Sequence, residues 1–232
     1  MTVIEFKPWP KTPRLYRSVT ITEKIDGTNA AVIVKEFPFG THLDEPPANA
    51  VLVFGPGKMD NEGLPAVEYL VSAQSRRRIV TPGNDNHGFA SWVWENAEYL
   101  ARTLEEGHHY GEWWGVGIQR GYAMSKRVFS LFNLRKWGDT TFENDQLRTV
   151  PVLYRGAFGD WAVNESLSML ECHGSQASPG YTKPEGVCVF HEDSNQVFKV
   201  LLENDHLSKS EAANTVTTAP PADWFKPYRV AA

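Results

Sequence analysis

The sequence has few cysteines, no long apolar run and no excess of positive charge. Two cysteines among 232 residues cannot build a disulfide framework, which indicates a reducing compartment. No apolar stretch approaches the roughly 18 residues of a membrane-spanning helix, and the first residues lack the apolar centre of a signal peptide. We therefore expect a cytoplasmic protein without a membrane partner. The net charge of −5 argues against a protein that coats nucleic acid through general electrostatic attraction, but leaves room for a local basic channel.

A phosphate-binding loop of the form GxxxxGK followed by Ser or Thr is also absent. The stretch GPGKMD at 55–60 lacks the required spacing, which argues against a P-loop ATPase. The chain does contain 41% hydrophobic and 12% aromatic residues, enough for a sizeable core. Its length favours one compact domain, which we predict over 1–213, followed by a linker and short C-terminal segment at 214–232. We expect a monomer.

Alternating apolar residues predict many short strands and few helices. The run 19–35 predicts two strands divided by Asp26 and Gly27, and helices are expected at 89–106 and, after Asp160 as N-cap, at 161–171. Less regular patterns predict further strands at 50–54, 76–80, 127–134, 150–154, 186–191 and 196–202, and short helices at 64–72 and 203–213. Since the strands do not alternate with long helices, the fold class is expected to be mixed α+β with mostly antiparallel sheets.

The strongest chemical signal is the string EKIDGTN at 23–29. Lys24 ends a predicted strand, and strand alternation puts it on the same face as Asp26. A lysine amine becomes a nucleophile when burial or a nearby cation lowers its pKa. Asp26 could then hold the ammonium, a metal or a nucleotide hydroxyl. Taken alone, the same four residues KIDG are also compatible with an ordinary hairpin turn.

The string resembles the nucleotide-acceptor motif of the covalent nucleotidyltransferases, which are the ATP-dependent DNA and RNA ligases and the mRNA capping enzymes. EKIDGTN, with Glu23 before the lysine and Asn29 at its end, is most similar to RNA ligases of the T4 RNA ligase 2 type. The resemblance implies that Lys24 is the residue that becomes adenylylated. It also implies that Asp26 belongs to the catalytic set and that Glu23 and Asn29 help to bind the nucleotide.

Later segments resemble the remaining motifs of this superfamily in the same order. YGEWWGVGIQRGY at 110–122 implies a ribose contact by Glu112, and FSLFNL at 129–134 implies that Phe132 stacks on adenine. PEGVCVF at 184–190 implies that Glu185 serves the metal and phosphates. VFKVLL at 197–202 implies that Lys199 contacts the α-phosphate. QSRRRIV at 74–80 implies that Arg76, or Arg78 as a second candidate, contacts the nucleotide or the 5′-phosphate.

The chain departs from the family pattern at two positions. Asn133 stands where the family usually has aspartate, and Leu201 stands where a second lysine is usual. Either Lys199 alone contacts the phosphate or Lys209 reaches the site as well.

The resemblance implies a nucleotidyltransferase domain that uses ATP and Mg²⁺ or Mn²⁺, with Glu185 and Glu112 as the metal-binding carboxylates. The expected product is a lysyl-AMP intermediate, from which AMP passes to a 5′-phosphate end that is then joined to a 3′-hydroxyl. The 30 residues after Leu202 are too few for the OB-fold that usually follows in DNA ligases and capping enzymes, so RNA is the expected partner. A minimal DNA nick ligase and a catalytically degenerate module that binds nucleotide or RNA ends remain as alternatives.

Overall fold

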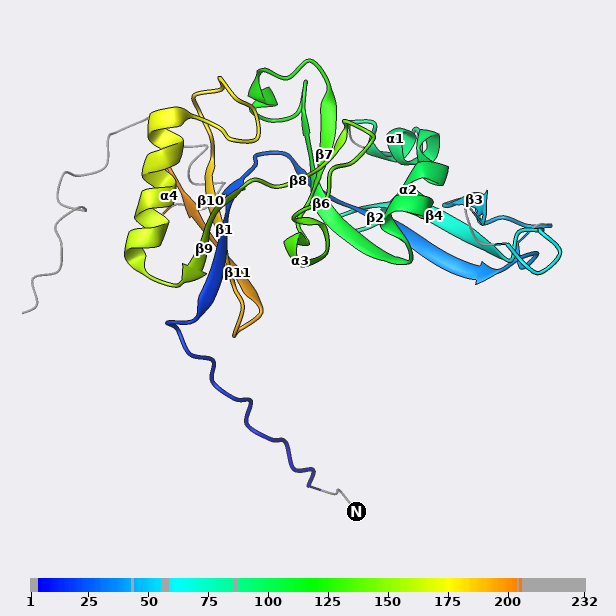
Figure 1. Cartoon of the computed structure of the whole chain (residues 1–232), viewed down its shortest axis with the longest axis horizontal. Coiled ribbons are helices and arrows are strands. Elements are labelled where there is room, and N and C mark those ends of the chain that lie inside the picture. Colours follow the sequence, from blue (N-terminus) through cyan, green and yellow to red (C-terminus); the bar gives the residue numbers. More distant parts are fainter. Residues whose placement is uncertain (1–3, 43, 56–58, 86, 204, 206–232) are drawn as a thin grey trace, which may run out of the picture.

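The computed structural model describes residues 4–42, 44–55, 59–85, 87–203 and 205. These residues form two β-sheets with helices on their outer faces (Figure 1), which confirms the α+β class. No separate OB-fold lies among the strands of this part of the chain. None of its helices combines the length and the apolar character needed to cross a bilayer. The predicted C-terminal segment 214–232, Lys209 and nearly all of the helix expected at 203–213 lie outside the described residues.

The smaller sheet is four-stranded and antiparallel, in the order β11-β10-β1-β9. One helix, α4 (Asp160–His173), packs on one face of this sheet. The strands are β1 (Ser18–Lys24), β9 (Val152–Ala157), β10 (Gly186–His191) and β11 (Gln196–Leu201). Strand alternation sends Val19 and Ile21 toward α4 and turns Thr22 and Lys24 to the opposite face.

The larger sheet has seven strands, in the order β3-β4-β2-β6-β7-β8, with β5 paired to β4. All its pairs are antiparallel except β7 with β8. The strands are β2 (Thr28–Pro38), β3 (Val51–Phe54), β4 (Val67–Ser75), β5 (Ile79–Val80), β6 (Gly107–Gly115), β7 (Arg127–Leu131) and β8 (Leu147–Thr149). The remaining helices are α1 (Phe89–Glu95), α2 (Ala97–Leu104), the 3₁₀ helix η1 (Gly121–Ala123) and α3 (Leu134–Trp137).

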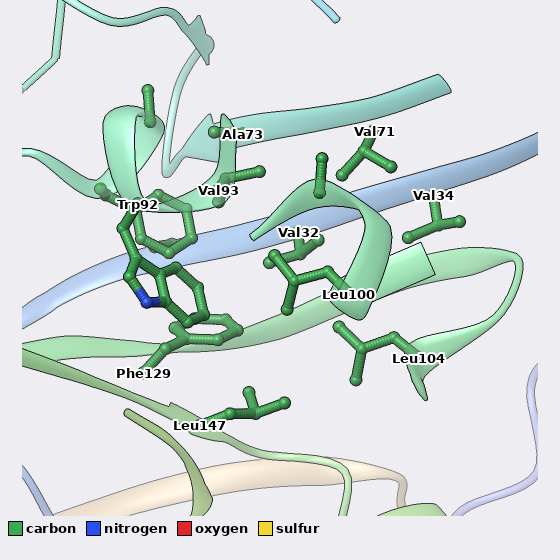
Figure 2. Packing of buried hydrophobic residues seen from close by; sticks show 14 of the residues in the cluster. Val32, Val34, Val71, Ala73, Trp92, Val93, Leu100, Leu104, Phe129 and Leu147 are labelled. Carbon is green, nitrogen blue, oxygen red and sulfur yellow. The ribbon is translucent and has the colours of Figure 1, made fainter. Parts of the chain in front are cut away.

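The main core lies between α1, α2 and the larger sheet. Figure 2 shows Trp92 and Leu100 from these helices against Val32 of β2 and Phe129 of β7, all at most 5% exposed. A second core lies between α4 and the smaller sheet. A third, small cluster around Ile25, Trp114, Tyr122, Val128 and Val150 fills the region where the chain passes from one sheet to the other. Burial of these apolar side chains is the main force that holds both sheets together.

Two of the expected elements are wrong. The helix expected at 64–72 is part of strand β4, in which Tyr69, Val71 and Ala73 alternate into the core. The buried Glu68 fits this strand because the backbone N–H groups of Gly40 and His42 satisfy its carboxylate, at 2.9 and 2.7 Å. The strand expected at 76–80 is instead a turn followed by the two-residue strand β5.

Two helix boundaries also differ from the expectation. The helix expected at 89–106 is divided at Asn96, whose side-chain amide donates to the Trp92 carbonyl at 2.8 Å and whose side-chain oxygen accepts from Asn144. Such a side-chain bond to the backbone competes with helix continuation. Asp160 is the first residue of α4 rather than its N-cap, which is Gly159.

Candidate active site

Lys24 lies at the end of β1, where the chain leaves the smaller sheet. Its Nζ forms an ion pair and hydrogen bond with the Glu185 carboxylate, and the two side chains are only 18% and 7% exposed. Glu185 directly precedes β10, whose first residue, Gly186, pairs with Lys24 across the strands. The β1–β10 register therefore brings together two charged groups that are 161 residues apart in the sequence. Such a shielded pair is strong because little water competes with it.

Lys199 lies on the same face of the smaller sheet. It is paired with Cys188 of β10, which in turn is paired with Thr22 of β1. Since directly paired residues point to the same face, Lys24, Cys188 and Lys199 share the surface that faces away from α4. Burial raises the pKa of the Cys188 thiol to about 11, so this thiol stays neutral between the charged groups. Leu201 also shares this face, while Lys209 lies outside the described residues.

Glu112 and Asn29 come from the larger sheet. They are directly paired between β6 and β2, and their neighbours Trp113 and Ala30 point the other way into the main core. Burial is the main cause that raises the pKa of Glu112 to about 7, and the negative charge of Glu185 raises it as well. The positive charge of Lys24 and a hydrogen bond from the Gly27 backbone N–H act in the opposite direction and lower this pKa. This electrostatic influence of Lys24 and Glu185 indicates that the two sheets contribute to one site.

Asp26 occupies the turn between β1 and β2. Its backbone N–H donates to the Tyr122 hydroxyl at 2.9 Å, and its carboxylate accepts from Arg120 Nε at 3.3 Å. Arg120 also donates to the carbonyl of Lys183 at 3.1 Å, next to the segment that carries Glu185. Arg120 and Tyr122 thus hold the Lys24 turn and the Glu185 segment together. Both residues lie in the GIQRGY string, but sequence reasoning gave them no such part.

The Glu23 carboxylate lies on the opposite face of β1 from Lys24 and is 1% exposed. It accepts hydrogen bonds from the Ser175 hydroxyl at 2.6 Å and from the backbone N–H groups of Gln176 and Ala177 at 2.7 and 2.8 Å. Burial raises the pKa of this carboxyl, while the three hydrogen bonds lower it. These three hydrogen bonds attach β1 to the 175–177 loop on the face opposite Lys24. Because the Glu23 carboxylate is buried and already hydrogen-bonded there, we no longer assign it to the nucleotide.

The two candidate arginines and Phe132 are all exposed at the surface. Arg76 is exposed in the turn after β4 and exerts an electrostatic influence on Glu112, whereas Arg78 donates to the Asn84 side chain at 3.1 Å. Of the two, Arg76 is therefore the candidate that lies near the site. Phe132 follows β7 with 42% of its surface exposed, so its ring is available to a ligand. Asn133 caps α3 by accepting from the Lys136 backbone N–H at 3.2 Å.

Stability is expected to fall as the pH rises from about 5 to 8. Glu112 has a folded-state pKa of about 7, above its ordinary 4.5, so the folded state binds this proton more tightly than the unfolded chain does. The resulting stabilisation, at most about 3 kcal/mol, is complete below pH 4.5 and is lost through pH 7. Glu112→Gln cannot ionise and should flatten the dependence of the melting temperature on pH. The melting temperatures of the wild type and of Glu112→Gln are measured by circular dichroism across this pH range. If both fall equally as the pH rises, Glu112 does not have the raised pKa that its burial implies.

Comparison with known proteins agrees with these motifs. The family model described as RNA ligase matches residues 17–201, whereas the search of curated proteins gave no match. Among solved structures, a Naegleria gruberi RNA ligase with AMP and Mn is 15% identical to this chain, with a TM-score of 0.46. The match covers 81% of this chain and 50% of the Naegleria chain. A second, with ATP and Mn, has 14% identity and a TM-score of 0.43, covering 80% and 49%.

The chain thus spans about half the length of those structures. The family match extends from the residue before β1 to the last residue of β11. It includes the segments that carry Lys24, Glu112, Glu185 and Lys199, and it covers well over half of the sequence. On this basis the chain belongs to the RNA ligase family.

Proposed function

We propose that this protein is an ATP-dependent RNA ligase that works through a covalent lysyl-AMP intermediate on Lys24. The observation that carries the proposal is the shielded contact of Lys24 with Glu185 at the junction of the two sheets, under the electrostatic influence of Glu112. A lysine in such a contact is held in one position, and its neighbour can take up its proton. Nucleophilic attack by an amine requires both properties.

The first step transfers AMP from ATP to the protein. The Lys24 ammonium first gives a proton to Glu185, which frees the lone pair of its nitrogen. The nitrogen then attacks the α-phosphorus: the N–P bond forms as the bond to the bridging oxygen breaks, pyrophosphate leaves with that electron pair, and a second nitrogen proton passes to solvent. An oxygen of an RNA 5′-phosphate then attacks the same phosphorus; the N–P bond breaks, and the nitrogen takes up a proton to become the lysine amine again. Finally the 3′-hydroxyl attacks the 5′-phosphate, which seals the strand and releases AMP. In-line placement of these groups supplies most of the expected acceleration.

Each nucleotide part has a suitable neighbour in the site. Glu112, with a pKa near 7, can donate or accept a hydrogen bond at the ribose hydroxyls. The half-exposed Phe132 ring offers a stacking surface for adenine. Lys199, on the Lys24 face of the smaller sheet, and Arg76, whose charge acts on Glu112, can bind the phosphates. Asn29, paired with Glu112, offers a further polar group on the same side.

The carboxylates fit Mg²⁺ or Mn²⁺ bound together with the nucleotide. No group of three His, Cys, Asp or Glu side chains suited to a metal occurs in the described part of the chain. Magnesium is commonly held by one or two carboxylates plus substrate phosphates, and Glu185 and Glu112 would supply those two. When bound, the metal would neutralise charge on the phosphates and so favour the departure of pyrophosphate.

One experiment tests the proposal directly. The protein is incubated with ATP labelled at the α-phosphate and Mg²⁺, and the label that survives denaturation is measured. We expect one AMP per chain on the peptide that contains Lys24, and no label in excess EDTA, because the carboxylates and the triphosphate repel each other without a divalent cation. A protein that binds ATP without covalent label would be the degenerate binding module instead. GTP in place of ATP should label poorly.

The second stage of the same experiment identifies the polynucleotide. The labelled protein is given nicked duplexes that differ only in the sugar at the 3′-hydroxyl end. We expect faster sealing with ribose than with deoxyribose, because the terminal 2′-hydroxyl is the group that distinguishes RNA. Equal rates would favour the minimal DNA nick ligase.

A further inference from the structure

The first described residues form an extended arm that leaves the body of the protein (Figure 1). Every residue from Ile4 to Ser18 is exposed, and no hydrogen bond joins Ile4–Pro13 to another described residue. The arm nevertheless carries large apolar side chains: Phe6 and Trp9 are 90% and 89% exposed. Apolar side chains gathered on an exposed segment mark a contact surface for a partner.

The base of the arm is fixed to the smaller sheet. The Arg14 backbone N–H donates to Asp193 at 3.0 Å, the Leu15 carbonyl lies 2.8 Å from His191 Nε2, and the Phe158 backbone N–H donates to the Arg17 carbonyl at 2.7 Å. From this base β1 runs to Lys24, a distance of about 20 Å at roughly 3.3 Å per residue. The arm therefore begins on the strand that carries the candidate nucleophile, but well away from the reacting atoms.

The charge of the arm is opposite to that of the whole chain. It carries Lys7, Lys11, Arg14 and Arg17 against the single carboxylate Glu5, whereas the chain has a net charge of −5. Cations interleaved with aromatic side chains are the combination that binds single-stranded nucleic acid, since the cations contact phosphates and the rings stack on bases. Pro8, Pro10 and Pro13 favour an extended backbone, which lowers the entropy lost when such a segment binds a strand.

Three basic residues of the body already have partners. Arg120 is bound to Asp26, Lys126 to Asp145, and Arg127 donates to the carbonyls of Val116 and His87. Lys7 and Lys11 have no ion-pair partner among the described residues, and the same holds for Arg76, Lys183 and Lys199 in the body. Phosphates can bind Lys7 and Lys11 without breaking an ion pair.

We propose that residues 4–17 bind the RNA strand at a distance from the break, with Lys7 and Lys11 against phosphates and Trp9 stacked on a base. This inference rests on the proposed RNA ligase function and adds a second contact for the same substrate. The arm lies away from Lys24, so it contributes to RNA affinity and leaves the transfer of AMP from ATP unchanged.

The test compares RNA affinity with AMP transfer in the full chain. Fluorescence anisotropy with a 3′-labelled single-stranded RNA of about 24 nucleotides measures binding at several salt concentrations. Lys7→Ala/Lys11→Ala is expected to bind about tenfold more weakly, with a salt slope smaller by about 0.7 for each phosphate that the variant no longer binds. Trp9→Ala is expected to bind about tenfold more weakly with no change in salt slope, and Trp9→Phe should restore most of the affinity.

The control variant Lys35→Ala/Arg102→Ala removes the same charge from exposed positions in β2 and α2 and should bind as the wild type does. All variants should accept AMP from labelled ATP at the wild-type rate. If the arm variants bind RNA with unchanged affinity and salt slope while still accepting AMP, the arm proposal is wrong and its prolines would suit a protein partner. Failure of the wild type to accept AMP would instead remove the proposed function.

Discussion

Replacing Lys24 by alanine is expected to abolish the transfer of AMP to the protein, by at least ~10³-fold in rate. No other amine with a shielded carboxylate partner is found at the junction of the sheets within the described residues. Removal of the lysine also leaves the Glu185 carboxylate, 7% exposed, without its partner. We expect this to cost about 3 kcal/mol of folding free energy, so circular dichroism must accompany the labelling assay.

Lys24→Arg separates the chemical effect from the structural one. Its guanidinium keeps the positive charge beside Glu185 but stays protonated at any ordinary pH and cannot attack phosphorus. We therefore expect near wild-type melting and no covalent AMP. Lys35→Ala, at an exposed position in β2, serves as the lysine control and should be labelled normally. Covalent AMP on Lys24→Ala or Lys24→Arg would mean that another residue is the nucleophile.

Replacing Gly27 by alanine is expected to reduce both stability and AMP transfer. An added Cβ would lie 2.6 Å from the Trp113 carbonyl oxygen, 2.7 Å from Trp114 Cβ and 2.9 Å from Glu112 Cγ. Two of these atoms belong to the backbone or the base of a buried side chain and cannot move aside freely. The β1–β2 turn or β6 must shift instead, at a cost of about 1–3 kcal/mol. A shift of that size also moves Lys24 relative to Glu112, which is expected to slow labelling about 10²-fold.

Gly159→Ala is the matched control. Its backbone has φ of −167°, which any residue adopts, and the new Cβ would meet the ring of Trp161. Since Trp161 is 59% exposed, its ring can rotate away, so we expect a smaller loss of stability and normal labelling. Thermal unfolding and the initial rate of label incorporation measure both quantities. Similar losses in the two variants would show that crowding at Gly27 has no special connection with the site.

The sequence predicted the fold best where burial follows simple alternation. Strands β1 and β2 lie where alternating residues predicted them, and β10 and β11 coincide with the strands expected at 186–191 and 196–202. The prediction failed at β4, where Glu68 is buried and its carboxylate is held by the backbone N–H groups of Gly40 and His42 and by the His42 ring, 26 to 28 residues away in the sequence. It failed at Asn96 for a related reason: the helix is interrupted there by a side-chain bond to the backbone.

In the candidate site too, some residues could be predicted from the sequence and others could not. Motif order indicated Lys24 and Glu185, and strand register explains how they meet. The position of the Glu23 carboxylate was not predictable, since most of its partners are backbone N–H groups of the 175–177 loop. The part played by Arg120 likewise depends on carbonyl oxygens beside Glu185.

The order of the strands along the chain has a consequence for how the protein folds. All strands of the larger sheet lie between β1 and β9 of the smaller one, so the smaller sheet closes only by pairing residues 130 to 139 positions apart. Closing such a long loop costs more entropy than forming the nearer pairs of the larger sheet, so the larger sheet is expected to form first. During synthesis the chain reaches Glu185 long after Lys24. In a nascent chain, Lys24 therefore lacks its Glu185 partner until the segment that carries Glu185 has been synthesised.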